Sequence, residues 1–145
     1  MNKDHRNSVN ASLTDYCSIG EASKRSGISA KMIRYYESTG LIKDVKRTQS
    51  NYRYYSEQDV RQLQFLKSAR DLGFSSEQMV QLVTLWNDSS RSNVEVKKLA
   101  LVHVEEIDKR MLELQSMRNA LMEMVKQCHG DGKPECPILD GIAKR

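Results

Sequence analysis

The chain has 145 residues, a formal net charge of +4 and three cysteines. A chain of this length forms one or two small modules, and it contains no apolar run of about eighteen residues that would predict a membrane span. The polar first fifteen residues lack the apolar stretch of a secretory signal, so we expect residues 1–15 to form a disordered arm. Few cysteines without an export signal favour a cytoplasmic protein with reduced thiols.

The positive charge is concentrated in the first half of the chain. Residues 16–73 contain eleven Lys or Arg against six Asp or Glu, whereas residues 91–127 contain seven against six. A basic half beside a nearly neutral half suggests a polyanionic partner, most simply DNA. On charge alone, an ordinary solvated basic surface is an equal alternative.

Two short helices are predicted near the start of the basic half. Ser18 and Glu21 form a capping-box pattern that opens a helix ending at Gly27, and a second helix is expected over residues 30–38. Two such helices joined by a Ser-Gly-Ile-Ser turn are typical of a helix-turn-helix. The second helix offers polar and aromatic side chains that can reach phosphates or base edges, namely Ser29, Lys31, Arg34, Tyr35 and Tyr36. We expect one of the two tyrosines to lie in the core instead.

The composition of residues 41–56 predicts two short strands around a polar turn. Asn51 suits the turn because asparagine tolerates positive φ better than most residues. Basic side chains alternate with tyrosines along this segment, with Lys46 and Arg47 on one side of the turn and Arg53 on the other. The pattern indicates a basic wing that completes a DNA-binding domain over residues 16–73.

Two more helices are expected before residue 90. Ser56 opens the first, which ends at Gly73 and has one apolar face made of Val60, Leu63, Leu66 and Ala69. A second capping box at Ser75–Gln78 opens the next helix, so residues 74–90 are predicted to form a connecting segment.

Residues 91–127 contain neither proline nor glycine. Eight positions spaced alternately by four and three residues are apolar with one exception, and they are Ala100, Val104, Ile107, Met111, Leu114, Arg118, Leu121 and Val125. This seam predicts a two-stranded coiled coil, and a helix over this range would be about 55 Å long. Such a helix cannot bury its seam within a small chain, so we expect a homodimer. The alternative is that it packs back on the N-terminal helices.

Two cysteines, Cys128 and Cys136, flank a loop in the last segment, residues 128–145. Thiolates are soft ligands that suit a soft d¹⁰ ion, and the glycines, aspartate and proline between them allow the backbone to turn. Pro137 predicts a short terminal helix with Cys136 as its N-cap, where the helix dipole favours a thiolate. The residues alone leave open a metal site, a redox pair or two cysteines without a ligand.

Several segments together resemble the MerR-type metal-responsive transcription regulators, and within them the copper-efflux regulator (CueR-like) branch. The resemblance covers residues 18–139. Its carriers are Ile19-Gly-Glu-Ala-Ser, Ile33-Arg-Tyr-Tyr-Glu37, Gly40-Leu-Ile42, Asn51-Tyr-Arg-Tyr-Tyr55, Leu66-Lys-Ser-Ala-Arg-Asp-Leu-Gly-Phe74, Leu114-Gln-Ser-Met-Arg118 and the loop from Cys128 to Leu139.

The resemblance implies a mainly α fold, a dimer of winged helix-turn-helix domains joined by an antiparallel coiled coil, and no enzymatic activity. It implies a homodimer that binds an inverted-repeat operator in double-stranded promoter DNA, meets RNA polymerase there and activates transcription by distorting the DNA. By resemblance, the residues facing DNA are Lys31, Arg34, Tyr36, Arg47, Tyr52 and Arg53.

The resemblance also implies that Cys128 and Cys136 bind one Cu(I), Ag(I) or Au(I) ion per subunit. The divalent-ion branches have a further cysteine, donated by the partner subunit, where this chain has Asn93. The monovalent branch usually has serine there, so Asn93 is a departure that still removes a thiolate. His129 could reach a metal, and Cys17 is interpreted as a structural or incidental thiol.

Other functions fit part of the sequence. The same scaffold could sense a divalent metal (Zn, Cd, Pb or Hg), redox state or a drug. Cys128 and Cys136 could instead belong to a small thiol metal carrier or oxidoreductase that does not bind DNA, but the basic helix-turn-helix half argues against that reading.

Overall fold

The protein, seen in a computed structural model, is described for residues 15–145 and divides after Ser92 into two compact units. The predicted disordered arm lies outside the described residues except for Asp15.

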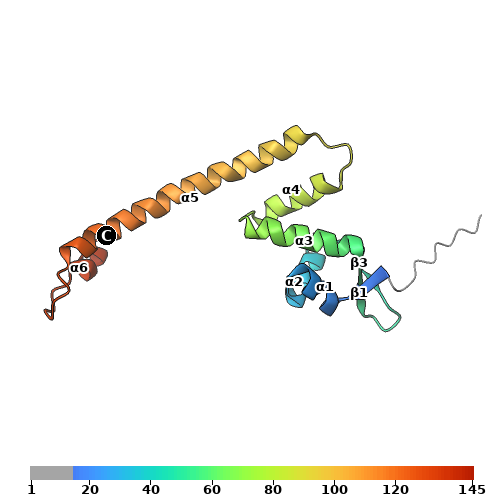
Figure 1. Cartoon of the computed structure of the whole chain (residues 1–145), viewed down its shortest axis with the longest axis horizontal. Coiled ribbons are helices and arrows are strands. Elements are labelled where there is room, and N and C mark those ends of the chain that lie inside the picture. The colour runs from blue at the N-terminus through green and yellow to red at the C-terminus, as the bar shows by residue number, and fades with distance from the viewer. Residues whose placement is uncertain (1–14) are drawn as a thin grey trace, which may run out of the picture. The chain divides into compact units, whose positions relative to one another are not determined.

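The N-terminal unit combines a small sheet with four helices (Figure 1). Its elements in chain order are β1 (Tyr16–Ser18), α1 (Ile19–Ser26), α2 (Ala30–Ser38), β2 (Lys46–Arg47), β3 (Arg53–Ser56), α3 (Glu57–Asp71) and α4 (Ser76–Asn87). The sheet is antiparallel with the order β1-β3-β2. The two wing strands are confirmed, whereas β1 was not predicted, because three residues are too few to show an alternating pattern.

Serine side chains begin all four helices of this unit. Ser18, Ser29, Ser56 and Ser75 are the N-caps, each accepting a hydrogen bond from a backbone N–H in the first turn. The capping boxes at Ser56 and Ser75 are complete, because the side chain of the third helical residue also accepts a hydrogen bond from the backbone N–H of the N-cap serine. The predicted helix starts and the capping box at Ser75 are therefore confirmed, whereas at Ser18 only the serine half of the predicted box is formed.

The core of the N-terminal unit gathers side chains from α1, α2, α3, α4 and β3. The predicted apolar face of α3 is fully used, since Val60, Leu63, Leu66 and Ala69 are all buried. The rings of Phe65 and Trp86 stack with centroids 4.4 Å apart and thereby join α3 to α4. This core fixes the positions of α2 and of β3, which present the basic surface.

The C-terminal unit consists of α5 (Asn93–Gln127) and α6 (Pro137–Ala143). The long helix has 35 residues and begins two residues after the predicted start. Its apolar seam is exposed in the single chain, with exposed fractions from 41% at Ile107 to 62% at Met111. Among the described residues, none of the helices is sufficiently long and apolar to cross a membrane.

The short helix α6 packs closely against the end of α5. A Cβ atom at Gly141 would lie 3.0 Å from the Sδ atom of Met124, so the absence of a side chain at Gly141 allows this approach. The chain thus leaves α5 at Gln127, forms a loop and returns to the same helix.

Candidate nucleic-acid interface and thiol site

Helix α2 presents three of the predicted contact residues to solvent. Lys31 and Arg34 are exposed, as is Ser29, whose Oγ accepts a hydrogen bond from Met32 N at 3.2 Å. Since this bond uses only an acceptor position, the hydroxyl hydrogen of Ser29 can still be donated. The exposed side of α2 can therefore offer cationic and hydroxyl donors to a phosphate backbone.

The structure contradicts the prediction that Tyr36 faces DNA. Its side chain is 1% exposed and its hydroxyl is buried without a partner among the described residues, whereas Tyr35 is 48% exposed. Residues three apart share a helix face, so Tyr36 joins the buried Ile33 in the core. That spacing was a signal in the sequence that could have separated the two tyrosines, and Tyr35 is the aromatic side chain that α2 presents.

The wing presents the other three predicted residues. Arg47 and Arg53 are paired opposite each other on β2 and β3, and Tyr52, in the connecting turn, is 73% exposed. Asn51 has φ of 65°, which confirms the turn predicted at this residue. A hydrogen bond of 2.8 Å from Thr48 N to Tyr52 O closes the turn.

Strand β1 adds an aromatic support to the wing that the sequence did not reveal. Lys46 Nζ donates to the hydroxyl of Tyr16 at 3.1 Å, and this bond raises the pKa of Lys46. The ring of Tyr16 also meets that of Tyr54 edge to face at 5.0 Å. The side chain of Lys46 is thus linked to β1.

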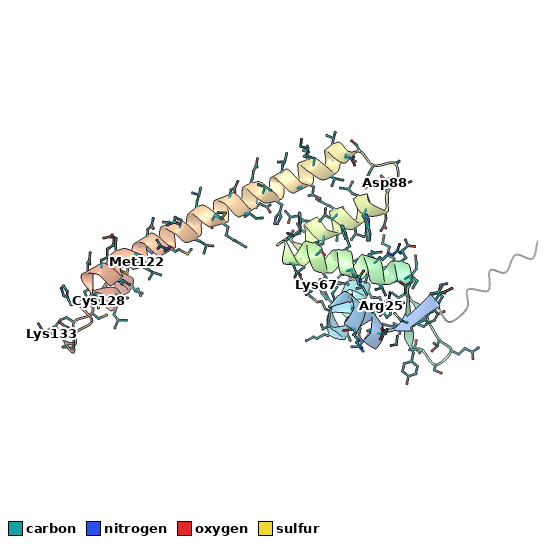
Figure 2. The ribbon with its side chains drawn as sticks, in the orientation of Figure 1. Arg25, Lys67, Asp88, Met122, Cys128 and Lys133 are labelled. Atoms are coloured by element: carbon teal, nitrogen blue, oxygen red, sulfur yellow. The ribbon has the colours of Figure 1, made fainter. Side chains whose placement is uncertain are left out.

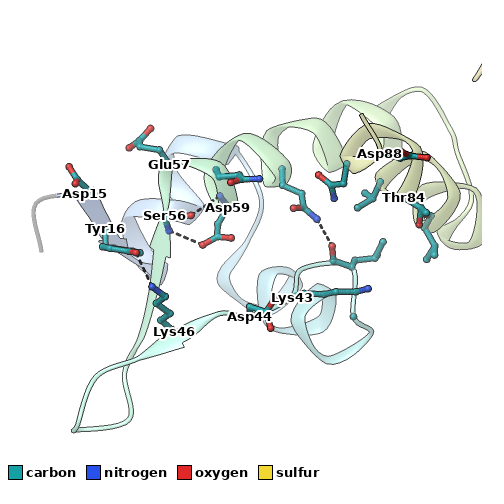
Figure 3. A pocket seen from close by; sticks show the side chains of 17 residues that line it. Asp15, Tyr16, Lys43, Asp44, Lys46, Ser56, Glu57, Asp59, Thr84 and Asp88 are labelled. Carbon is teal, nitrogen blue, oxygen red and sulfur yellow. Dashed lines mark hydrogen bonds between the residues drawn. The ribbon is translucent and has the colours of Figure 1, made fainter. Parts of the chain in front are cut away.

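The bond between Lys46 and Tyr16 borders a cavity of about 1030 Å³ (Figure 3). Its lining comes from residues 15–88 and contains no cysteine. All of the lining residues therefore belong to the N-terminal unit.

The thiol loop joins the end of α5 to the start of α6. Cys128 lies immediately after α5, and Cys136 is the N-cap of α6 with Pro137 in its first turn, as predicted. Both side chains are half-buried, and Lys133 lies at the tip of the loop (Figure 2). Because Gly141 packs on Met124, both ends of the loop return to the same part of α5.

The two free thiols, Cys128 and Cys136, are the soft donors that the loop offers. In residues 15–145, no group of three or more His, Cys, Asp or Glu side chains is placed to hold a metal ion, so His129 does not form such a group with both thiols. Two thiols without a further donor fit a soft monovalent ion of low coordination number, and they fit tetrahedral Zn²⁺ poorly.

Cys17 and Asn93 belong to other elements of the chain than the loop. Cys17 is on β1 opposite Tyr55, and burial raises the pKa of its thiol, which disfavours the thiolate form. Asn93 is the first residue of α5, and a 35-residue helix separates it from Cys128 by about 50 Å. Within one subunit Asn93 therefore cannot reach the thiols.

A helix-turn-helix with a basic wing, followed by a long helix with an exposed apolar seam, defines a class of DNA-binding regulators. Residues 17–84 match the MerR HTH family regulatory protein family, and residues 60–124 match the family described as MerR, DNA binding.

The chain is also similar to individual proteins along most of its length. It is 50% identical over 125 residues to heavy metal-dependent transcription regulator 2 of Rhizobium meliloti, covering 86% of this chain and 85% of that protein. It is 39% identical over 125 residues to the HTH-type transcriptional regulator CueR of Salmonella typhi, covering 86% and 91%.

The fold is also similar to that of a solved transcription regulator. The transcription regulator PbrR691 from Ralstonia metallidurans CH34 in complex with lead(II) aligns with a TM-score of 0.75 and 28% identity, covering 87% of this chain and 98% of that one. The chain belongs to the MerR family of transcription regulators, and its matches support the copper and heavy-metal branch of that family. It is a DNA-binding regulator and not an enzyme, as the sequence predicted.

Proposed function

We propose that this metal-responsive MerR-family regulator senses Cu(I), or the related ions Ag(I) and Au(I), and activates transcription from a promoter for metal efflux or detoxification. The observation that supports this choice of metal is the pair of free thiols, Cys128 and Cys136, at the two ends of one loop, because thiolates are soft ligands that suit a soft monovalent ion. Two thiolates and one monovalent cation leave a single net negative charge at the site.

The ion would be held once per subunit by the two cysteines. Thiolates bind Cu(I) strongly because both are soft, and the partial burial of both side chains restricts access of water. The packing of α6 on α5 through Gly141 and Met124 supports the approach of the two sulfurs, since it returns the second cysteine to the helix that the first one follows.

The working form is proposed to be an antiparallel homodimer through α5. The seam of α5 is exposed in one chain, and a second copy would bury it. In an antiparallel pair, the start of one α5 lies beside the end of the other, so Asn93 of the partner subunit would approach the thiol loop. An asparagine there adds no thiolate, which favours a monovalent over a divalent ion.

The dimer would bind double-stranded promoter DNA in the cytoplasm, next to RNA polymerase. A two-fold dimer matches an inverted-repeat operator. Contacts are proposed from Ser29, Lys31 and Arg34 on α2 and from Arg47, Tyr52 and Arg53 on the wing, all of which have exposed or partly exposed side chains. The metal would act by binding better to the dimer conformation that distorts the promoter, a deformation that costs on the order of several kcal/mol.

X-ray absorption of the purified protein with Cu(I) tests the metal assignment, with two sulfur ligands expected. In a reporter assay, Cys128→Ser and Cys136→Ser should each abolish metal-induced transcription while leaving DNA binding intact. Cys17→Ser is the matched control, because its thiol lies on β1 in the other unit, and it should respond as the native protein does. Native transcription that responds to Zn²⁺ as strongly as to Cu(I) would refute the two-thiolate argument and favour His129 as a ligand.

A divalent-metal sensor is the second candidate, and the similarity to the lead(II)-bound PbrR691 favours it. The reporter assay with Zn²⁺ and Pb²⁺ distinguishes it from the Cu(I) sensor. A thiol metal carrier without DNA binding is excluded if the protein binds DNA with an affinity that falls steeply with salt.

A further inference from the structure

A carboxylate on α2 contacts both arginines of the wing. Glu37 Oε2 accepts a hydrogen bond from Arg53 Nε at 2.6 Å, and Glu37 Oε1 accepts one from Arg47 Nη2 at 3.4 Å. The Glu37 side chain is 20% exposed, so this bridge between α2 and the wing is partly shielded from water. The two arginines are the residues proposed to bind phosphate from the wing.

The strand register explains why a carboxylate is needed there. Arg47 and Arg53 are directly opposite on β2 and β3, and like charges in such a pair repel each other and destabilise the pairing. Since each oxygen of Glu37 binds one arginine, the carboxylate offsets this repulsion and ties both side chains to α2.

The way in which each arginine is bound leaves donors available. Arg53 donates its Nε–H to Glu37, and within residues 15–145 its Nη1 and Nη2 groups have no hydrogen-bond partner. Arg47 binds a second residue besides Glu37, because its Nη1 donates to Asn51 O at 3.4 Å. A guanidinium has five N–H donors, so a phosphate can bind while Glu37 remains bound.

We propose that Glu37 is a positioning residue of the DNA interface, which holds Arg47 and Arg53 in the orientation that the DNA backbone requires. The inference rests on the proposed DNA contacts of the wing. It leads to an unusual expectation, because removing a negative charge near DNA ordinarily strengthens binding, whereas the loss of Glu37 should weaken it.

The size of the effect follows from preorganisation. Immobilising a flexible side chain at an interface costs about 0.5–1.5 kcal/mol, which corresponds to about 2- to 13-fold in affinity. Glu37→Gln, which keeps the shape and removes the charge, should therefore weaken DNA binding by roughly 3- to 10-fold.

The matched control is Glu77→Gln, which makes the same change of charge in the same unit. Glu77 is an exposed residue in the first turn of α4, and among the described residues it forms no ion pair. Glu77→Gln should bind DNA as tightly as the native protein or slightly more tightly.

The experiment measures the dissociation constant at several salt concentrations by fluorescence anisotropy. The probe is a duplex selected from a random-sequence library with the native full-length protein, and thermal unfolding is followed for each variant. Arg53→Ala and the double variant Glu37→Gln/Arg53→Ala complete a double-mutant cycle. Since Glu37 also binds Arg47, Glu37→Gln should weaken binding in the Arg53→Ala background by a smaller factor than in the native protein, and equal factors in the two backgrounds would refute a role through Arg53.

The salt dependence adds a readout that a loss of stability alone would not give. Glu37→Gln should lower the salt slope by about one unit if a phosphate contact is lost, although the net charge of the protein rises by one. If Glu37→Gln binds as tightly as the native protein while Arg53→Ala binds weakly, the positioning role is refuted and the proposed wing contact stands. If Arg53→Ala binds normally, the wing contact itself is refuted and the role of Glu37 with it.

Discussion

The two units of this protein differ in how far their apolar side chains are buried. Leu63 and Leu66 in α3 are completely buried, whereas Leu114 and Met111 in α5 are 57% and 62% exposed. The N-terminal unit therefore has a core of its own, while the seam of α5 gains protection from water only when another surface covers it. We infer that the DNA-binding unit is complete as a monomer and that the sensing unit is completed by dimerisation.

Met111→Pro should have the largest effect on this comparison. Proline in a helix interior removes a hydrogen bond and clashes with the preceding turn, at a cost of about 3 kcal/mol or more. The dimer should dissociate, as measured by sedimentation, while the core of the N-terminal unit stays folded. Met111→Leu keeps the volume and the apolar character and should remain dimeric. A stable dimer of the proline variant would show that α5 is not the interface.

Leu63→Ala and Leu114→Ala should separate the two kinds of apolar position. Leu63→Ala creates a cavity in a packed core and should destabilise the protein by about 2–5 kcal/mol at any protein concentration. Leu114→Ala should lower the unfolding temperature by an amount that depends on protein concentration, because it weakens association. Thermal unfolding at two concentrations a hundredfold apart tests this, and a concentration-independent shift for Leu114→Ala would contradict the seam.

Asn93→Cys should move the metal response of the sensing unit partly toward Zn²⁺ or Hg²⁺. The new thiolate would join the two cysteines only across an antiparallel dimer, because about 50 Å of helix separates it from Cys128 of its own chain. Val94→Cys is the control, since it adds a thiol one residue further along on a different helix face. Reporter transcription against Cu(I), Ag(I) and Zn²⁺ measures the change, and equal responses from both variants would exclude a specific role for this position.

The smallest effect concerns an exposed ion pair in the N-terminal unit. Arg25 donates two hydrogen bonds of 2.7 Å to Glu57, and these bonds lower the pKa of that carboxyl. A lowered carboxyl pKa stabilises the fold above the pKa of the unfolded chain, and this contribution is lost as the pH falls through the folded value. Glu57→Gln should therefore be slightly less stable than the native protein at neutral pH, and the difference should vanish on acidification. Urea unfolding at several pH values measures it, with Glu77→Gln, the same substitution in the first turn of α4, as the matched control.

Local signals in the sequence account for most of the secondary structure. The caps at Ser56 and Ser75, the turn at Asn51 and the apolar face of α3 were all predictable, because each depends on residues within about four positions along the chain. The family was also predictable, since the two family models together match residues 17–124. The metal, the dimer and the DNA contacts stay predictions, to be tested by the experiments proposed above.

By itself, the sequence determined where the helices begin, which half is basic and where the two thiols of the loop lie. The tertiary structure alone decided that β1 pairs with β3 and that Glu37 bridges Arg47 and Arg53. It also decided that α6 returns to α5 at Met124. The physical reason is that these features depend on contacts between segments that are separated along the chain, and the spacing of neighbouring residues does not encode such contacts.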